Sequence, residues 1–280
     1  MIYRFTYEVT SNCNYKCDYC GTYKDEEYSD IYTINKIIGF FKLLSADNID
    51  NTIEIQLFGG ECTLHPHFMY IVEELSKLSN VELILFTNFS ADLDLYKQFC
   101  EIAKGHIHNI SPSFHYNHIN TEEFLNKLRY ITNNYDINID VGCMLSKGRY
   151  TEEEHINIFS EFKNNKNVTL SLFPILKANL EDFKAVKHNT SNNKDENNIN
   201  IVIDKNTLNK RYNKNCDCYI TNAFINSKGI LSPCFQYRDI ISLNLLTANK
   251  ALNYYKVLNK LRFTCNKLFC YRYTNWVDYK

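Results

Sequence analysis

Short runs of β-branched and aromatic residues alternate with segments of helical periodicity along the first 176 residues of the chain. Most of these runs are bounded by Gly, Asn or Pro, which is typical of β-strands. The pattern predicts six strands, at residues 3–10, 52–58, 81–86, 108–113, 137–144 and 168–176.

Between the predicted strands, apolar residues recur on one face of a helix, most clearly within residues 34–44 and 68–78. Pro66 suits the first turn of the second of these helices. Thr151 and Glu154 have the spacing of a capping box, which marks the start of a further helix. We therefore expect strands and helices to alternate up to about residue 176.

Six strand–helix units at a spacing of roughly 30 residues imply parallel strands joined by right-handed crossovers. A complete barrel of eight units needs about 250 residues, and the alternation ends well before that length. The expected fold class is α/β, a partial (β/α)6 TIM-like barrel with a small cysteine-rich C-terminal extension. In such sheets the functional residues lie at the carboxyl ends of the strands.

The C-terminal part of the chain has a different composition. Residues 186–212 are rich in Asn, Lys and Asp and are expected to form a linker with at most one short strand or helix. Residues 213–280 are too few for an independent core without a staple, which their five cysteines could supply. Within them, residues 223–233 indicate a hairpin that turns at 226–229. The expected domains are thus a barrel at 1–185, the linker, and a cysteine-rich module at 213–280.

Charge and composition exclude several functional classes. Of the 280 residues, 45% are hydrophobic, and 31 basic residues oppose 32 acidic ones, for a net charge of −1. Without a basic excess we expect neither a nucleic acid nor a membrane surface as partner. No apolar run approaches the roughly 20 residues of a membrane span, and the first residues do not form a secretory signal. The sequence therefore predicts a cytoplasmic protein.

Eleven cysteines are unusual for such a protein, and reduced thiols in clusters indicate metal ligands or catalytic groups. Cys13, Cys17 and Cys20 follow the first strand with C-x3-C-x2-C spacing. Structural zinc takes four ligands, whereas a 4Fe–4S cluster held by three cysteines keeps one iron open for another ligand. The alternative is a zinc site completed by a distant fourth ligand such as His115.

This segment resembles the signature of the radical S-adenosylmethionine (SAM) enzymes, in which the same spacing follows the first strand of a partial barrel. An aromatic residue usually precedes the last cysteine there, and Tyr19 stands at that position. The resemblance implies that the open iron binds the methionine moiety of SAM. It also implies that an electron from the cluster cleaves SAM to methionine and a 5′-deoxyadenosyl radical. Whether SAM is consumed or recycled stays open.

The resemblance also implies which residues bind SAM. Gly59-Gly60-Glu61 ends the second strand and matches the family's GGE motif, whose backbone and carboxylate contact the SAM amino group. Asn88 ends the third strand, and Ser113 ends the fourth, where relatives contact the SAM carboxylate or ribose. Met144 is expected to line the adenine pocket. His115 is the candidate for a substrate-side acid or base, and a structural histidine is the alternative.

A second cysteine set resembles the Twitch or SPASM-type extension of radical SAM enzymes, which carries auxiliary 4Fe–4S clusters. Its members are Cys216, Cys218, Cys234, Cys265 and Cys270. Five cysteines fit one auxiliary cluster, with the choice between Cys216 and Cys218 open. Zinc is the alternative metal, because four thiolates do not distinguish the two.

Two clusters indicate abstraction of a substrate hydrogen followed by an electron-accepting step. The predicted function is that of a radical SAM oxidoreductase that modifies a peptide of the ribosomally made, post-translationally modified (RiPP) type. The first alternative is oxidation or rearrangement of a small metabolite. A non-catalytic, metal-stabilised binding module is the alternative from a different class.

The predicted function implies two protein partners. The family resemblance implies a flavodoxin- or ferredoxin-type electron donor. Met1 precedes the first strand directly, so any leader-peptide-binding domain is expected to be a separate protein.

Overall fold

A computed structural model of the chain describes residues 1–17, 20, 26–145, 151–174, 200–203, 215–216, 222–234, 242–258, 260 and 263–264. Its central strands are β1 (Ile2–Thr10), β2 (Thr52–Gly59), β3 (Val81–Thr87), β4 (Ile107–Phe114), β5 (Asn138–Leu145) and β6 (Val168–Pro174). They pair in chain order and in parallel, so each of the six predicted strands is present. The sheet does not close on itself, which confirms the partial barrel.

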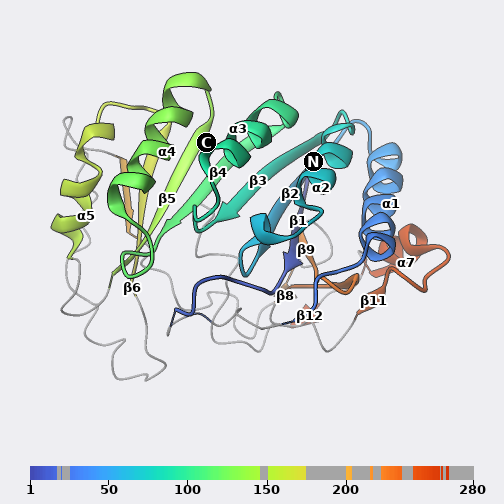
Figure 1. Cartoon of the computed structure of the whole chain (residues 1–280). Coiled ribbons are helices and arrows are strands. Elements are labelled where there is room, and N and C mark those ends of the chain that lie inside the picture. The colour runs from blue at the N-terminus through green and yellow to red at the C-terminus, as the bar shows by residue number, and fades with distance from the viewer. Residues whose placement is uncertain are drawn as a thin grey trace.

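Helices connect the strands and cover one face of the sheet (Figure 1). They are α1 (Ile31–Asp47), α2 (Phe68–Ser76), α3 (Leu93–Ile102), α4 (Thr121–Asn134) and α5 (Glu152–Ile158). Two short 3-10 turns, η1 (Cys62–Leu64) and η2 (Ser160–Phe162), follow β2 and α5. The capping box predicted from Thr151 and Glu154 is present at the start of α5. None of the helices in the described ranges is long and apolar enough to cross a membrane.

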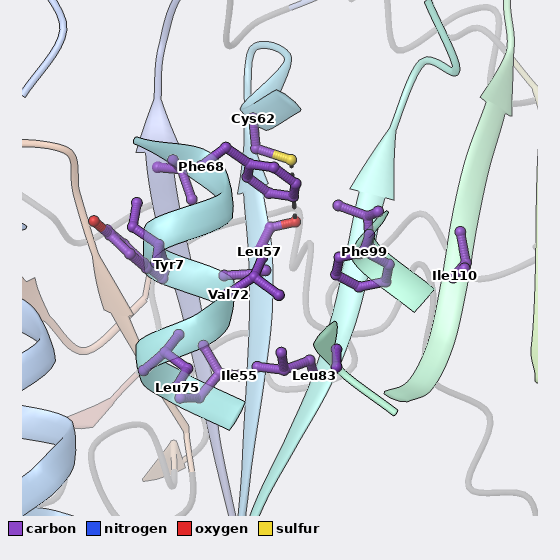
Figure 2. Close-up of a cluster of buried hydrophobic side chains, with 14 of the residues drawn as sticks. Tyr7, Ile55, Leu57, Cys62, Phe68, Val72, Leu75, Leu83, Phe99 and Ile110 are labelled. Atoms are coloured by element: carbon purple, nitrogen blue, oxygen red, sulfur yellow. Dashed lines mark hydrogen bonds between the residues drawn. The ribbon is translucent and has the colours of Figure 1, made fainter. Parts of the chain in front are cut away.

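The hydrophobic core lies between the sheet and these helices. Alternate residues of β1, such as Phe5 and Tyr7, are fully buried against α1, because successive strand side chains point to opposite faces. Figure 2 shows the same arrangement under α2, where Phe68 and Val72 meet the apolar side chains of the central strands. Cys62 belongs to this core, with its thiol 3.2 Å from the Phe86 carbonyl oxygen, so it is an inert thiol.

The other face of the sheet carries a polar stripe. Thr6 donates a hydrogen bond to Gln56 (2.8 Å), and the Arg4 guanidinium lies 3.2 Å from the Glu54 carboxylate. On the far strands Ser171 donates to Asp140 at 2.6 Å. Strand alternation places these residues opposite the core, so the polar stripe lines the face that the helices leave uncovered.

Segments from the end of the chain extend this sheet at both edges. β7 (Asn200–Ile203) pairs in parallel with β6, inside the predicted linker. β9 (Asn222–Ile225) pairs in parallel with β1, and β10 (Ile230–Ser232) and β11 (Leu243–Asn244) follow in antiparallel order. The predicted hairpin at 226–229 joins β9 to β10. A separate two-stranded ladder pairs β8 (Asn215–Cys216) with β12 (Phe263–Thr264).

The hairpin and helix α7 (Ala251–Leu258) belong to the main core, which the sequence did not indicate. Ala223 and Ile225 are buried in the same cluster as Phe5. The Tyr255 ring lies 5.7 Å from the Phe5 ring and 5.8 Å from the Phe40 ring. The described part of the cysteine-rich segment is therefore stabilised by the barrel itself, in addition to any metal. The predicted domain boundaries stay a prediction.

Substitution of two adjacent tyrosines of α7 tests whether this helix packs into the main core. Tyr255 is 2% exposed and Tyr254 is 57% exposed. We expect Tyr255→Ala to lower the free energy of unfolding by about 3–5 kcal/mol through loss of aromatic packing. Tyr254→Ala should change it by less than about 0.5 kcal/mol. Urea unfolding measures both, and equal small effects would contradict the docking of α7.

Candidate functional site

The C-x3-C-x2-C loop leaves the carboxyl end of β1, at the edge of the sheet where the sequence predicted it. Cys13 and Cys17 are half-buried and Cys20 is exposed, while Tyr19 lies outside the described residues. Asn12 closes the base of the loop, since its side chain accepts a hydrogen bond from the Glu26 amide at 2.7 Å and donates one to the Glu26 carbonyl oxygen. The two ends of the loop, at Asn12 and Glu26, are therefore hydrogen-bonded to each other.

Nitrogen donors surround the sulfur of Cys13. The Tyr15 amide nitrogen lies 3.4 Å from Cys13 Sγ, and Asn88 Nδ2 lies 3.7 Å from it. Asn88 Nδ2 also donates to Asn14 Oδ1 at 2.9 Å. Burial raises the pKa of the Cys13 thiol to about 11 in the metal-free chain. Metal binding would displace that proton, because thiolates are the ligands.

Residues that follow β4 hold the other side of the loop. His115 Nδ1 lies 3.7 Å from Cys17 Sγ. Tyr15 stacks on His118, with ring centroids 4.6 Å apart, and meets the His115 ring edge-on at 5.8 Å. Burial lowers the pKa of His115 to about 4, so its imidazole is neutral at pH 7. Tyr15 and His118 have no predicted functional role, because they come together only in the fold.

The two glycines of Gly59-Gly60-Glu61 allow β2 to touch the start of the loop. The amides of Gly60 and Glu61 donate to the carbonyl oxygens of Thr10 (2.8 Å) and Asn12 (2.7 Å). A Cβ atom at Gly59 would lie 2.0 Å from Thr10 O, and one at Gly60 would lie 2.2 Å from Asn12 O. Glycine is therefore required here by the approach of two main chains.

The Glu61 side chain points into the protein and is fully buried. Its carboxylate accepts hydrogen bonds from the Thr63 hydroxyl (2.6 Å), the Thr87 hydroxyl (2.9 Å) and the Asn88 amide (2.5 Å). Desolvation raises the pKa of Glu61, and these donors oppose the shift. Glu61 thus joins the exit of β2 to the exit of β3, and its predicted contact with SAM stays a prediction.

The remaining predicted cofactor residues line the uncovered face at the ends of β4 and β5. Ser113 pairs in register with Gly142, and Met144 with Phe173 of β6. A Cβ at Gly142 would lie 3.4 Å from the Phe173 ring and 3.7 Å from Ser113 Oγ, so these three residues lie close together. The roles of Ser113 and Met144 in binding SAM stay predictions.

The groups around the cysteine loop are compatible with the 4Fe–4S cluster that the sequence resemblance implies. Within the described ranges, no three His, Cys, Asp or Glu side chains are close enough to hold one ion. A cluster bonds each cysteine to a different iron, so its thiolates need not converge on one point. Hydrogen bonds to the sulfurs tune such clusters, and the donors at Cys13 have that geometry. An open cavity of about 600 Å³ adjoins the loop, lined by Asn12, Cys13, Asn14, Glu26, Glu27, Tyr28 and Leu64.

The second cysteine set is only partly described. Cys218, Cys265 and Cys270 lie outside the described residues, as does the side chain of Cys216. Cys234 is half-buried and follows β10, which runs antiparallel to β9 and so away from the cysteine loop. The metal of this set stays a prediction.

Comparisons with known proteins address the fold and the family. The family model of the radical SAM superfamily matches residues 7–188. GTP 3′,8-cyclase of Mannheimia succiniciproducens is 24% identical over 176 residues, covering 58% of this chain and 49% of the cyclase. The chain thus spans about half the length of this relative.

Two solved structures share the fold. Streptococcus suis SuiB bound to S-adenosylmethionine matches with a TM-score of 0.66 and 15% identity, covering 90% of this chain and 65% of SuiB. Native anSMEcpe with bound AdoMet and Cp18Cys peptide matches with a TM-score of 0.58 and 16% identity, covering 98% of this chain and 87% of that one.

Gly60 and Gly39 form a matched pair for testing the contact between β2 and the loop. We expect Gly60→Ala to lower the free energy of unfolding by at least about 2 kcal/mol, because the added methyl group meets main-chain oxygens. A Cβ at Gly39, within α1, would meet nothing within 4 Å, so Gly39→Ala should raise it by about 0.5–1 kcal/mol. Urea unfolding compares the two, and a neutral Gly60→Ala would refute the close approach.

Proposed function

This chain belongs to the radical SAM superfamily, and from that premise we propose that it is an oxidoreductase that modifies a peptide by hydrogen abstraction. Cys13, Cys17 and Cys20 would hold the 4Fe–4S cluster. With SAM bound, this cluster supplies one-electron cleavage to methionine and a 5′-deoxyadenosyl radical. The observation that carries the proposal is the meeting of the cysteine loop, Asn88 and His115 at the exits of β1, β3 and β4.

The chain's own side chains suit binding and proton transfer at this edge. Gly59-Gly60-Glu61 and Ser113 would orient SAM, and Met144 would contact its adenine. His115, which lies 3.7 Å from Cys17 Sγ, would be the substrate-side acid or base. The helix-covered face is packed with apolar side chains, so we expect the substrate on the opposite face of the sheet.

Two neighbours support a peptide substrate. SuiB has been solved with its precursor peptide SuiA, and anSMEcpe with the Cp18Cys peptide. Both carry the fold of this chain, and the open cavity beside Cys13 is lined in part by Glu27 and Tyr28. A leader-peptide-binding protein and a flavodoxin- or ferredoxin-type donor would then act as separate partners.

Oxidation or rearrangement of a small molecule is the second candidate. The related cyclase is named for a reaction on GTP, and the polar stripe could bind a polar metabolite. Substrate-dependent formation of 5′-deoxyadenosine separates the two candidates. Stimulation by a peptide encoded beside this gene favours peptide modification, and stimulation by GTP alone favours the small molecule.

We further propose an auxiliary 4Fe–4S cluster on Cys234, Cys265, Cys270 and either Cys216 or Cys218. The β8–β12 ladder sets Cys216 opposite Phe263, two positions before Cys265 in the sequence. That register favours Cys216 over Cys218 as a ligand. The cluster would accept the electron that remains on the substrate after hydrogen abstraction.

Replacement of Cys13, Cys17 and Cys20 together by Ala tests the main proposal. The variant should lose about four irons per chain and all SAM cleavage, because the cluster has no other thiolate ligands on this loop. Cys100→Ala is the control, since Cys100 is buried in α3 away from the loop. Iron analysis and 5′-deoxyadenosine assays give the readout. Continued SAM cleavage by the triple variant would disprove the assignment.

Replacement of Cys234 and Cys270 by Ala tests the auxiliary cluster. Iron should fall by about one cluster of four atoms, while SAM cleavage without substrate persists because the barrel site is intact. Turnover of the substrate should stop, since the product electron has no acceptor. Elemental analysis is decisive, because one zinc and one 4Fe–4S cluster per chain would exclude the electron-accepting role.

A further inference from the structure

The side-chain amide of Asn88, in the turn after β3, contacts the cysteine loop. Asn88 is buried, and its Nδ2 lies 2.9 Å from Asn14 Oδ1 and 3.7 Å from Cys13 Sγ. Its Oδ1 accepts a hydrogen bond from the Ser90 amide at 2.9 Å. A flipped side chain would set its NH2 group against that N–H donor. The hydrogen bonds therefore fix which end of the amide faces the sulfur.

The next residue is held in a strained conformation. Phe89 has a φ of 60°, the only positive value at a non-glycine residue in the described part of the chain, and its side chain is fully buried. Bulky residues rarely adopt this conformation, and they keep it only where the surroundings enforce it. The Phe89 ring packs against Tyr96 (4.6 Å) and Phe124 (5.1 Å). These ring contacts hold the turn in which Asn88 lies.

Two buried ionisable side chains, Glu61 and Lys127, bind the backbone of this turn. Glu61 accepts the Asn88 amide at 2.5 Å. Lys127, 3% exposed on α4, donates to the Phe89 carbonyl oxygen at 2.7 Å and to Glu123 at 2.6 Å. A buried charge is costly unless it is hydrogen-bonded, and both side chains form such bonds with the backbone of adjacent residues, Asn88 and Phe89. The position of the turn is thus fixed by residues from α4 and from the GGE motif.

We propose that Asn88 is a positioning residue for the cysteine loop. Its side-chain amide donates a hydrogen bond to the Cys13 thiolate and thereby raises the reduction potential of the cluster. This inference rests on the proposed role of Cys13 as a cluster ligand. A donor to a ligand sulfur stabilises the reduced cluster, which carries the greater negative charge. Glu61 and Lys127 support Asn88 indirectly, because their hydrogen bonds hold the strained turn in which Asn88 lies.

The test is a redox titration of the reconstituted full-length protein, followed by electron paramagnetic resonance. The signal to follow is the one that changes when SAM is added, which identifies the barrel cluster. Asn88→Ala should keep its iron, but the ratio of reduced to oxidised cluster at a fixed potential should fall about tenfold. For a one-electron couple this is a shift of about 59 mV to lower potential. Asn35→Ala, an exposed asparagine on α1 that accepts from Tyr70, should leave the potential unchanged.

Two more variants keep the test decisive. Asn88→Asp keeps the oxygen that accepts from Ser90 but loses the donor, so it should shift the potential in the same direction if Asn88→Ala does not fold. Lys127→Met removes the hydrogen bond to the Phe89 carbonyl oxygen without changing the cysteine loop. It should also shift the reduction potential to a lower value. An unchanged potential in the Asn88 variants overturns the inference while the cluster assignment stands. Absence of a cluster from the parent protein would overturn the proposed function itself.

Discussion

The contact between the exits of β1 and β2 is the constraint on which the site depends. Gly59 and Gly60 bring the main chain of β2 against residues 10–12, with hydrogen bonds of 2.8 and 2.7 Å to the carbonyl oxygens of Thr10 and Asn12. This contact sets where the cysteine loop begins. It also sets where Glu61 enters the protein, and hence how the exit of β3 is held. The glycines thus position the cysteine loop through contacts of the backbone alone.

Buried hydrogen bonds of Glu61 and Lys127 link this contact to the exit of β3 and to α4. Glu61 binds groups from its own turn and from β3, and Lys127 adds a clamp from α4. In a low-dielectric interior such bonds are strong and their loss is costly. The network therefore favours one arrangement of the strand exits over slightly displaced alternatives. A radical reaction benefits from such rigidity, because the reacting atoms must stay close and oriented.

Local sequence patterns predict most of the strands and helices of the barrel. The six strands and the Thr151 capping box depend on residues close in sequence, so periodicity and cap spacing identify them. The parallel pairing of β9 with β1 has no such signature, because its partners are joined only in the fold. The C-x3-C-x2-C spacing likewise located the loop. Its contacts with Asn88, and the clamp by Lys127, depend on a strained turn at Phe89 that no composition rule identifies.

The pairing of β9 with β1 has a consequence for synthesis on the ribosome. Thr6 is translated early, but its partner Phe224 follows about 200 residues later. At 5–20 residues per second, one edge of β1 waits roughly 10–40 s for this partner. An unpaired edge strand is a template for aggregation. The nascent chain is therefore most vulnerable just before its last quarter emerges, when a chaperone that shields β1 would raise the yield of folded protein.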